Sequence, residues 1–177
     1  MRPLAASAIS LVVLGLLGCG VWFYVDRPPS NHHVRVVDVL NGDDIVVRLP
    51  GEGDVNIHYI GIDAPEIAHP RFGLEPGGHE AAQANRDIVL RKWVRLELDV
   101  EEVDPFGRVL AYVWVHQQDG SEVMANAEMV WRGYARVRTR GPNTKYESYL
   151  RDLQTRARDH GLGLWSSESG RRWASQR

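Results

Sequence analysis

The sequence predicts an α+β domain, a five-stranded β-barrel with three helices, preceded by an N-terminal membrane-spanning or signal helix. Three observations lead to this prediction. β-Branched runs separated by turn residues recur in the first half of the chain. At three later places the apolar residues change to helical spacing. Residues 4–25 form a run of 22 residues without a charge. The 177 residues suffice for one domain of about 150 residues and an appendage.

The N-terminal run 4–25 is long enough to cross a hydrocarbon core of roughly 30 Å, and Arg2 precedes it. The stretch LLGC, ending at Cys19, resembles a lipoprotein cleavage box, and a cleaved secretory signal is a third alternative. The apolar run continues past Cys19 as GVWFYV, whose aromatic residues are typical of a membrane interface, which favours an uncleaved anchor. All three alternatives predict that residues from 31 onward lie outside the cytoplasm, and two of them predict attachment to the membrane.

The remaining chain divides into a linker at 26–33, a domain at 34–166 and a basic tail at 167–177. Cys19 is the only cysteine, so the domain has none from which to form a disulfide. Its charge is segregated, with a net charge of −10 over 26–131 and +7 over 132–177. A basic C-terminal third is compatible with phosphate-rich partners, but a solvated helix face has the same composition.

The barrel strands are predicted in order from β-branched and alternating runs. Three strands at 34–40, 45–49 and 55–62 are broken by NGDD and PGEGD, which are turn compositions. Helical spacing predicts a helix over 78–93, and strict alternation predicts a fourth strand over 94–100. The run RVLAYVWV is apolar on both faces and predicts an interior fifth strand.

Two further helices are expected at 124–132 and 145–160, where the glycines of HGLG end the second. Five strands with one helix between the third and fourth, followed by two helices, form the element order of an OB-type barrel with helical additions.

Three acidic residues follow the ends of predicted strands. Asp43 lies in NGDD, and Asp63 and Glu66 lie in IGIDAPE. The two aspartates present hard oxygen ligands, which suit Ca²⁺ and leave room for waters and a substrate phosphate. Pro65 fixes the turn before Glu66, and a carboxylate there can orient or deprotonate an attacking water. Two ordinary turns would also contain such acids, so these residues alone leave both interpretations open.

Five motifs, NGDDI, IGIDAPE, DPFGRVLAYVW, RGYARV and GLGLWS, occur in order over 34–166 and resemble the staphylococcal (thermonuclease-like) nuclease family. The resemblance implies that Asp43, Asp63 and the main-chain carbonyl of Ala64 hold Ca²⁺. It also implies that Glu66 acts on the attacking water and that Arg108 contacts the scissile phosphate. A planar arginine suits this position, because it stabilises the charge that develops in the transition state.

The sequence departs from the family pattern at the predicted site. His58 stands where the family has a second arginine, and one preorganised donor is worth roughly 10²-fold to 10³-fold in rate. We expect a mostly neutral His58 with a pKa of about 6.5, a reduced activity, and a higher rate in His58→Arg. Asp44 replaces a threonine, and it either joins the ion or adds repulsion. Asn41 replaces an aspartate.

The family's two tyrosines near the nucleotide are absent, because Thr139, Arg140 and Gly141 occupy that stretch. We therefore expect Arg136, Arg138 and Arg140 to hold phosphates electrostatically, without base stacking at that wall.

The resemblance implies a Ca²⁺-dependent endonuclease, a monomer that hydrolyses DNA or RNA with little sequence preference while tethered to the membrane outside the cytoplasm. The alternative is a catalytically weakened nuclease-like domain that acts as a nucleic-acid or protein binding module. Retention of the two aspartates, the glutamate and Arg108 favours the enzyme. A histidine-based metal protein is disfavoured, because no recognised spacing relates His32, His33, His69 and His79.

Overall fold

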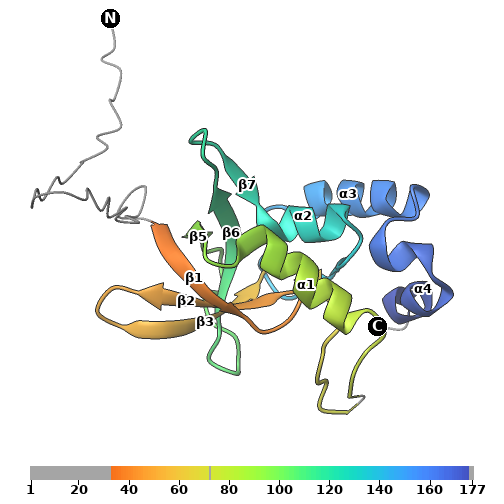
Figure 1. Ribbon diagram of the computed structural model, residues 1–177, viewed down its shortest axis with the longest axis horizontal. Coiled ribbons are helices and arrows are strands. Elements are labelled where there is room, and N and C mark those ends of the chain that lie inside the picture. Colours follow the sequence, from red (N-terminus) through yellow and green to blue (C-terminus); the bar gives the residue numbers. More distant parts are fainter. Residues whose placement is uncertain (1–32, 72, 176–177) are drawn as a thin grey trace, which may run out of the picture.

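The computed structural model describes residues 33–71 and 73–175, which fold as a closed five-stranded β-barrel with four α-helices (Figure 1). Its strands are β1 (His33–Val39), β2 (Asp44–Leu49), β3 (Gly53–Tyr59), β5 (Trp93–Glu97) and β6 (Val109–His116). They pair in the order β3-β2-β1-β5-β6, and a parallel pairing of β3 with β6 closes the ring. Closure pairs every barrel strand on both sides, as the predicted OB-type barrel requires.

The register of the β2–β3 hairpin places two residues of interest side by side. Asp44, the first residue of β2, pairs with His58 near the end of β3. On the other side of β3, His58 pairs with Leu110 of β6, two residues after Arg108. Side chains that start from paired positions on neighbouring strands lie close together on one face. The barrel closure therefore gathers Asp44, His58 and Arg108 at one place.

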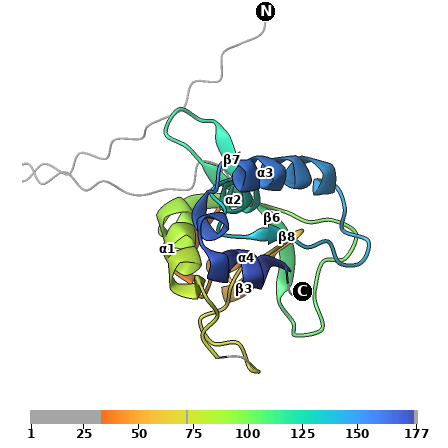
Figure 2. The same cartoon turned by 90° about the vertical axis from the view of Figure 1, so that its right-hand side faces the viewer.

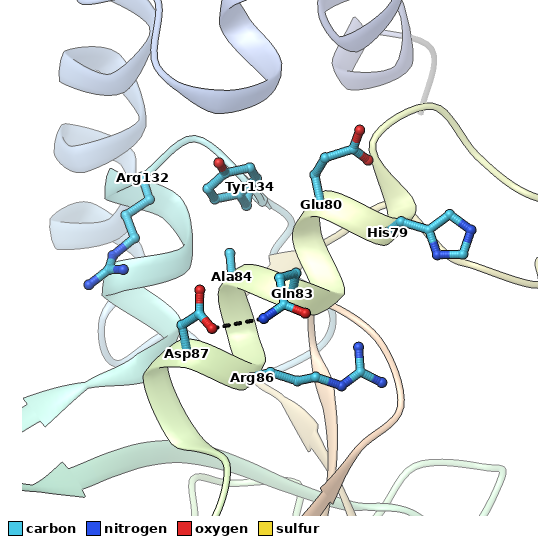
Figure 3. Close-up of a pocket in the computed structure, with 8 residues that line it drawn as sticks. All are labelled: His79, Glu80, Gln83, Ala84, Arg86, Asp87, Arg132 and Tyr134. Atoms are coloured by element: carbon cyan, nitrogen blue, oxygen red, sulfur yellow. Dashed lines mark hydrogen bonds between the residues drawn. The ribbon is translucent and has the colours of Figure 1, made fainter.

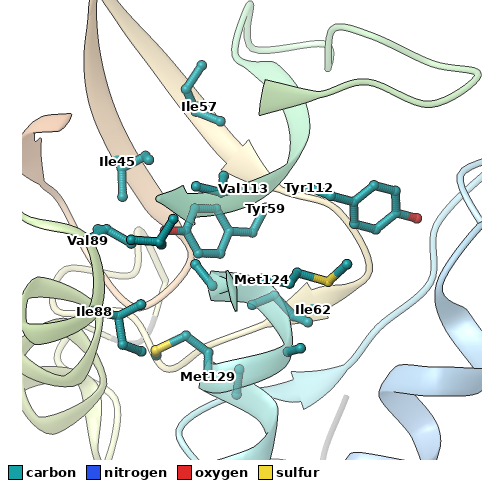
Figure 4. Packing of buried hydrophobic residues seen from close by; sticks show 14 of the residues in the cluster. Ile45, Ile57, Tyr59, Ile62, Ile88, Val89, Tyr112, Val113, Met124 and Met129 are labelled. Carbon is teal, nitrogen blue, oxygen red and sulfur yellow. The ribbon is translucent and has the colours of Figure 1, made fainter. Parts of the chain in front are cut away.

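The core fills the barrel and extends under the helices (Figure 4). Ile45, Val47 and Ile57 are fully buried, because alternate residues of each strand point inward. Tyr59 is also buried and donates a hydrogen bond 3.0 Å long to Oδ1 of Asn85 on the neighbouring helix. The β-branched runs of the sequence thus became barrel strands because one face of each could be buried.

The helices are α1 (Gly78–Val89), α2 (Ala125–Trp131), α3 (Glu147–Asp159) and α4 (Glu168–Ser175), with a 3₁₀ turn, η1, at Gly163–Ser166. Helices α2, α3 and α4 gather at one end of the barrel (Figure 2). Asn126 of α2 fixes this end, because its side chain accepts from Val113 N and donates to Ile60 O, at 2.9 and 3.0 Å.

Three short strands were not predicted as separate elements. β7 (Glu122–Met124) extends the barrel sheet beside β6, while β4 (Ile62–Asp63) pairs with β8 (Arg136–Val137) outside the barrel. The single strand predicted over 55–62 is divided at Gly61, whose φ of 81° is in the left-handed region. This turn releases Asp63 from the barrel and brings it to Arg136.

The segment 167–177, which we expected to be a basic tail, contains helix α4, so the described chain has one helix more than predicted. Gly170 and Trp173 are buried, and this packing explains a helix that the charge count does not suggest. The predicted anchor at 4–25 lies outside the described residues. Within 33–71 and 73–175, no helix has both the length and the apolar character needed to span a bilayer.

Candidate active site

The loop between β1 and β2 is organised by Asn41. Its Oδ1 atom accepts hydrogen bonds from the backbone N–H groups of Asp43 and Asp44, at 2.9 and 2.7 Å, as asparagine side chains do in turns. Gly42 allows a close approach to the neighbouring turn, because a Cβ atom at 42 would lie 2.5 Å from Cβ of Ala64. The two segments predicted to form a cation site therefore lie in contact.

The carboxylate of Asp43 is buried within this contact. Its Oδ2 atom accepts a hydrogen bond 3.1 Å long from the backbone N–H of Ala64. Burial raises the pKa of Asp43, the charge of His58 opposes the rise, and the charges of Asp44 and Asp63 add to it, so that the pKa is about 7. Such a carboxyl group ionises reluctantly, and a cation bound beside it would favour the anion.

Asp44 is the partner of two basic side chains. Its Oδ1 atom lies 2.9 Å from Nδ1 of His58 and 2.8 Å from Nη1 of Arg108. Asn41 Nδ2 donates to Oδ2 at 2.8 Å. Burial alone would raise the pKa of Asp44, but the hydrogen bonds from His58 and Asn41 and the charge of Arg108 hold it below its ordinary value. Asp44 is therefore an ionised, buried carboxylate that links two predicted catalytic residues.

His58 is more basic in this setting than expected from its sequence position. Burial lowers the pKa of His58, but the hydrogen bond to Asp44 and the charges of Asp43 and Asp44 outweigh burial and raise the pKa above 6.5. The pKa of His58 in the metal-free protein therefore lies above the value of about 6.5 that its sequence position suggests. A protonated His58 supplies a cation near the position where the family has an arginine.

Asp63 is held by two arginines. Arg136 donates from Nε and Nη2 to Oδ2 at 2.9 and 2.7 Å, and Arg138 donates from Nη1 to Oδ1 at 2.9 Å. Asp43, Asp44 and His58 form a separate group whose ligand atoms all lie within 4.8 Å of one another. Asp63 is not part of that group, and both of its oxygens accept from the arginines.

Glu66 is fixed through its backbone. Its N–H donates to Oε2 of Glu75 at 3.0 Å, and its carbonyl accepts from the N–H of Glu75 at 3.0 Å. Gly78, at the start of α1, presses on the same peptide, because a Cβ atom at 78 would lie 2.7 Å from the Glu66 carbonyl oxygen. The side chain of Glu66 lines the cleft described below.

Arg108 follows a tight turn that Asp104 stabilises. Oδ1 of Asp104 accepts from the backbone N–H groups of Phe106 and Arg108, both at 2.9 Å, and Oδ2 accepts from Arg108 Nε at 2.7 Å. Asp104 therefore stabilises the turn and engages the guanidinium of Arg108. The guanidinium of Arg108 lies 5.6 Å from the ring centre of Phe106, which is 83% exposed.

A single cleft of about 1400 Å³ collects most of these side chains. Pockets for compact ligands are about 300 to 1,000 Å³, so this cleft has room for a segment of a polymer. The predicted site residues that line it are Asp43, His58, Asp63, Glu66, Arg108, Arg138 and Arg140. Ala64 is buried behind Asp43, and Arg136 is buried beneath α4, away from the cleft lining.

A second pocket of about 620 Å³ lies between α1 and the chain that follows α2 (Figure 3). Its lining includes a hydrogen bond of 2.8 Å from Gln83 to Asp87, and it contains none of the predicted site residues. Its lining mixes acidic, basic and neutral side chains and includes none of the motif carboxylates Asp43, Asp63 and Glu66. The larger cleft is therefore the candidate active site.

The residues of the cleft fit a divalent cation. Asp43 is a buried carboxylate with a raised pKa, and a bound metal ion would lower that pKa by favouring the anion. Asp44 and Asp63 add further carboxylate charge. An oxygen-dominated donor set is typical of Ca²⁺ sites. His58 offers a nitrogen ligand, which is less suited to Ca²⁺, and its Nδ1 atom is already hydrogen-bonded to Asp44.

Sequence reasoning did not identify the roles of Glu75 and Phe106. Glu75 is nine residues after Glu66, and nothing in its local sequence indicates that it bonds that backbone. The sequence shows Phe106 as an aromatic residue in the turn before Arg108, but only the structure shows that it lines the cleft.

Comparisons with known proteins agree with the geometry. A family profile described as "Staphylococcal nuclease homologue" matches residues 56–167. The chain is 34% identical over 170 residues to the thermonuclease of Staphylococcus hyicus, covering 91% of this chain and 97% of the relative. It is 35% identical over 162 residues to the thermonuclease of Staphylococcus intermedius, covering 92% and 93%. Endonuclease YncB of Bacillus subtilis is 33% identical over 146 residues, covering 78% of this chain and 66% of the relative.

Proposed function

Because the chain belongs to the staphylococcal nuclease family, we propose that it is a Ca²⁺-dependent nuclease that hydrolyses DNA or RNA with little sequence preference. One observation carries the proposal, namely that Asp43, Asp63, Glu66 and Arg108 line the same cleft. A domain kept only for binding has no need for ligand, base and arginine side chains to share one cavity.

The side chains take their roles from their chemistry. Glu66 accepts a proton from the attacking water. Arg108 donates to phosphate oxygens as negative charge develops, after exchanging its contacts with Asp44. Asp43, Asp63 and the carbonyl of Ala64 would hold Ca²⁺, for which Asp63 must exchange a contact with Arg136 or Arg138. The bound ion would neutralise phosphate charge. All these groups come from one chain, and we propose that a monomer is active.

The test is cleavage of single-stranded DNA and of RNA by the full chain, with Ca²⁺ or with chelator. Activity is expected with Ca²⁺ only, and Asp43→Ala should abolish it while the barrel stays folded. The matched control is Asp152→Ala, an exposed position on α3. Binding of DNA without cleavage under all conditions would favour the binding-module alternative, and full activity in chelator would exclude the metal requirement.

We also propose that the domain is tethered to the membrane on the extracytoplasmic side. The support is the uncharged run 4–25, with the lipidated or cleaved forms as the other outcomes. Protease added to intact cells or spheroplasts should remove the domain, and the protein should fractionate with membranes. A cytoplasmic pool with an intact N-terminus would exclude all three forms.

A further inference from the structure

Helix α4 lies beyond the region matched by the family profile, which ends at residue 167. Its Trp173 is only 6% exposed. It contacts two side chains that are themselves hydrogen-bonded to residues of the cleft. One is Glu75, which bonds the backbone of Glu66, and the other is Arg136, which bonds Asp63.

The first connection leads to Glu66. Trp173 donates from Nε1 to Oε2 of Glu75 at 2.9 Å, and the same oxygen accepts from the backbone N–H of Glu66 at 3.0 Å. Glu75 is 3% exposed, and its own N–H donates to the carbonyl of Glu66. The indole therefore helps to fix the carboxylate that holds the Glu66 peptide.

The second connection leads to Asp63. The guanidinium of Arg136 lies 4.9 Å from the ring centre of Trp173, within the range of a cation–π contact. Its Nη1 atom donates to the carbonyl of Ala174 at 3.1 Å, and its other nitrogens donate to Asp63. Helix α4 thus holds the arginine that holds Asp63.

Helix α4 itself is seated by close backbone packing against η1. A Cβ atom at Gly170 would lie 2.3 Å from the carbonyl oxygen of Leu164, so only glycine fits this approach. The backbone N–H of Gly170 donates to Oγ of Ser167 at 3.1 Å, which stabilises the start of the helix. The position of Trp173 therefore depends on a contact that involves neither Glu75 nor Arg136.

We propose that Trp173 is a positioning residue for catalysis, which orients Glu66 through Glu75 and Asp63 through Arg136. The inference rests on the proposed nuclease function. A misplacement of about 1 Å in a catalytic group can cost as much as 10²-fold in rate. Trp173 does not line the cleft, so its loss acts on kcat and leaves substrate binding in place.

The test is Trp173→Phe in the full chain, which keeps an aromatic ring for Arg136 and removes the N–H donated to Glu75 together with the second ring of the indole. At saturating Ca²⁺ we expect kcat to fall about tenfold, with KM nearly unchanged. The matched control is Trp131→Phe on α2, a tryptophan that is 37% exposed and outside the cleft, which should keep the wild-type kcat.

A second variant, Gly170→Ala, displaces α4 without changing any side chain of the two connections, and it should lower kcat in the same way. Thermal melts establish that each variant is folded at the assay temperature. Wild-type kcat in both variants, or a loss that follows the unfolded fraction, would overturn the proposal.

Amide hydrogen exchange tests the connection from Trp173 to Glu66 independently of the proposed nuclease function. Exchange at the Glu66 N–H should be faster in Trp173→Phe than in wild type or in Trp131→Phe. This measurement needs no activity, so a wild-type protein without nuclease activity would refute the function and still test the connection. Unchanged exchange at Glu66 in Trp173→Phe would refute the connection itself.

Discussion

Nδ1 of His58 lies 2.9 Å from Oδ1 of Asp44, so two residues that depart from the family pattern are partners of each other. The same Asp44 oxygen lies 2.8 Å from Nη1 of Arg108. A buried carboxylate thus lies between an imidazole and a guanidinium, raises the pKa of the histidine and binds the arginine. The two departures must therefore be analysed together, because residues that share a hydrogen-bond network do not act additively.

We predict that His58→Arg raises the cleavage rate, and that Asp44→Thr/His58→Arg raises it by more than the two single changes combined. With Asp44 present, an arginine at 58 is paired with the carboxylate, which competes with the substrate phosphate. Replacing Asp44 by threonine frees both guanidinium groups. One freed donor in the transition state is worth at most about 10²-fold to 10³-fold. The measurement is a double-mutant cycle on kcat/KM at saturating Ca²⁺.

Glu66→Gln in each background is the control, because the loss of the base should remove activity whatever stands at 58. Thermal melts exclude unfolding as a cause. A lower rate in both His58→Arg and the double variant would mean that the site works through histidine, and the arginine-deficit account would then have to be abandoned.

The raised pKa of Asp43 predicts how the metal-free protein responds to pH. The unfolded-state pKa is about 3.9 and the folded-state pKa is about 7, so the folded protein binds the proton more tightly. Its contribution to stability is present below pH 4 and is lost as the pH rises through 7. We expect Asp43→Asn to be more stable than wild type at pH 8 in chelator, by at least about 1 kcal/mol.

Ca²⁺ should reverse this order. Bound metal favours the ionised carboxylate, so Ca²⁺ should raise the Tm of wild type at pH 8 and leave that of Asp43→Asn almost unchanged. His58 has a raised pKa as well, and its contribution is likewise lost as the pH rises above 6.5. His58→Gln therefore serves to separate the two titrations. A pH–stability curve in chelator that Asp43→Asn leaves unaltered would refute the assignment to Asp43.

The barrel was predictable from the sequence because its strands obey a local rule. Alternating or continuous β-branched runs at β1, β2 and β6 need to bury one or both faces, and turn residues separate them. The helices α1 and α3 follow from apolar spacing in the same way. The sequence shows Gly61, but it does not predict that Asp63 leaves the barrel and pairs with β8, because this depends on Arg136, 73 residues away.

Motif residues could be assigned to the cleft, while their partners could not. The roles of Asp44, Glu75 and Trp173 depend on contacts between distant segments, and neither spacing nor composition encodes them. Arg136 shows the same limit. It occurs among alternating arginines that suggest a phosphate-binding row, yet it is buried and paired with Asp63.

The arginines that do line the cleft predict a salt effect. Arg140 is exposed there, and an exposed arginine that contacts phosphate releases bound counterions. For single strands, Arg140→Gln should reduce the slope of log(1/KM) against log[salt] by about 0.7. The control is Arg151→Gln, an exposed arginine on α3 outside the cleft lining. Equal slopes in Arg140→Gln, Arg151→Gln and wild type would show that Arg140 does not contact phosphate.

The closeness of Gly42 to Ala64 predicts that the proposed metal site is sensitive to one added methyl group. In Gly42→Ala, the new Cβ would lie 2.5 Å from Cβ of Ala64 and 3.0 Å from Cβ of Ala81, so the loop must move. Overpacking of this kind costs about 1–3 kcal/mol, and here it shifts Asp43 relative to Asp63. We expect a lower Tm in chelator and, in addition, a weaker Ca²⁺-induced rise in Tm.

The double variant Gly42→Ala/Ala64→Gly tests whether this contact is the cause. Ala64→Gly removes the atom nearest to the new methyl group and leaves the main-chain carbonyl at 64 in place. Because the contact with Ala81 remains, the double variant should recover part of the Tm and part of the Ca²⁺ response. Ala64→Gly alone should retain the Ca²⁺ response, since any residue supplies the carbonyl. A double variant no better than Gly42→Ala would mean that the loop is not held against the Ala64 turn as the structure describes.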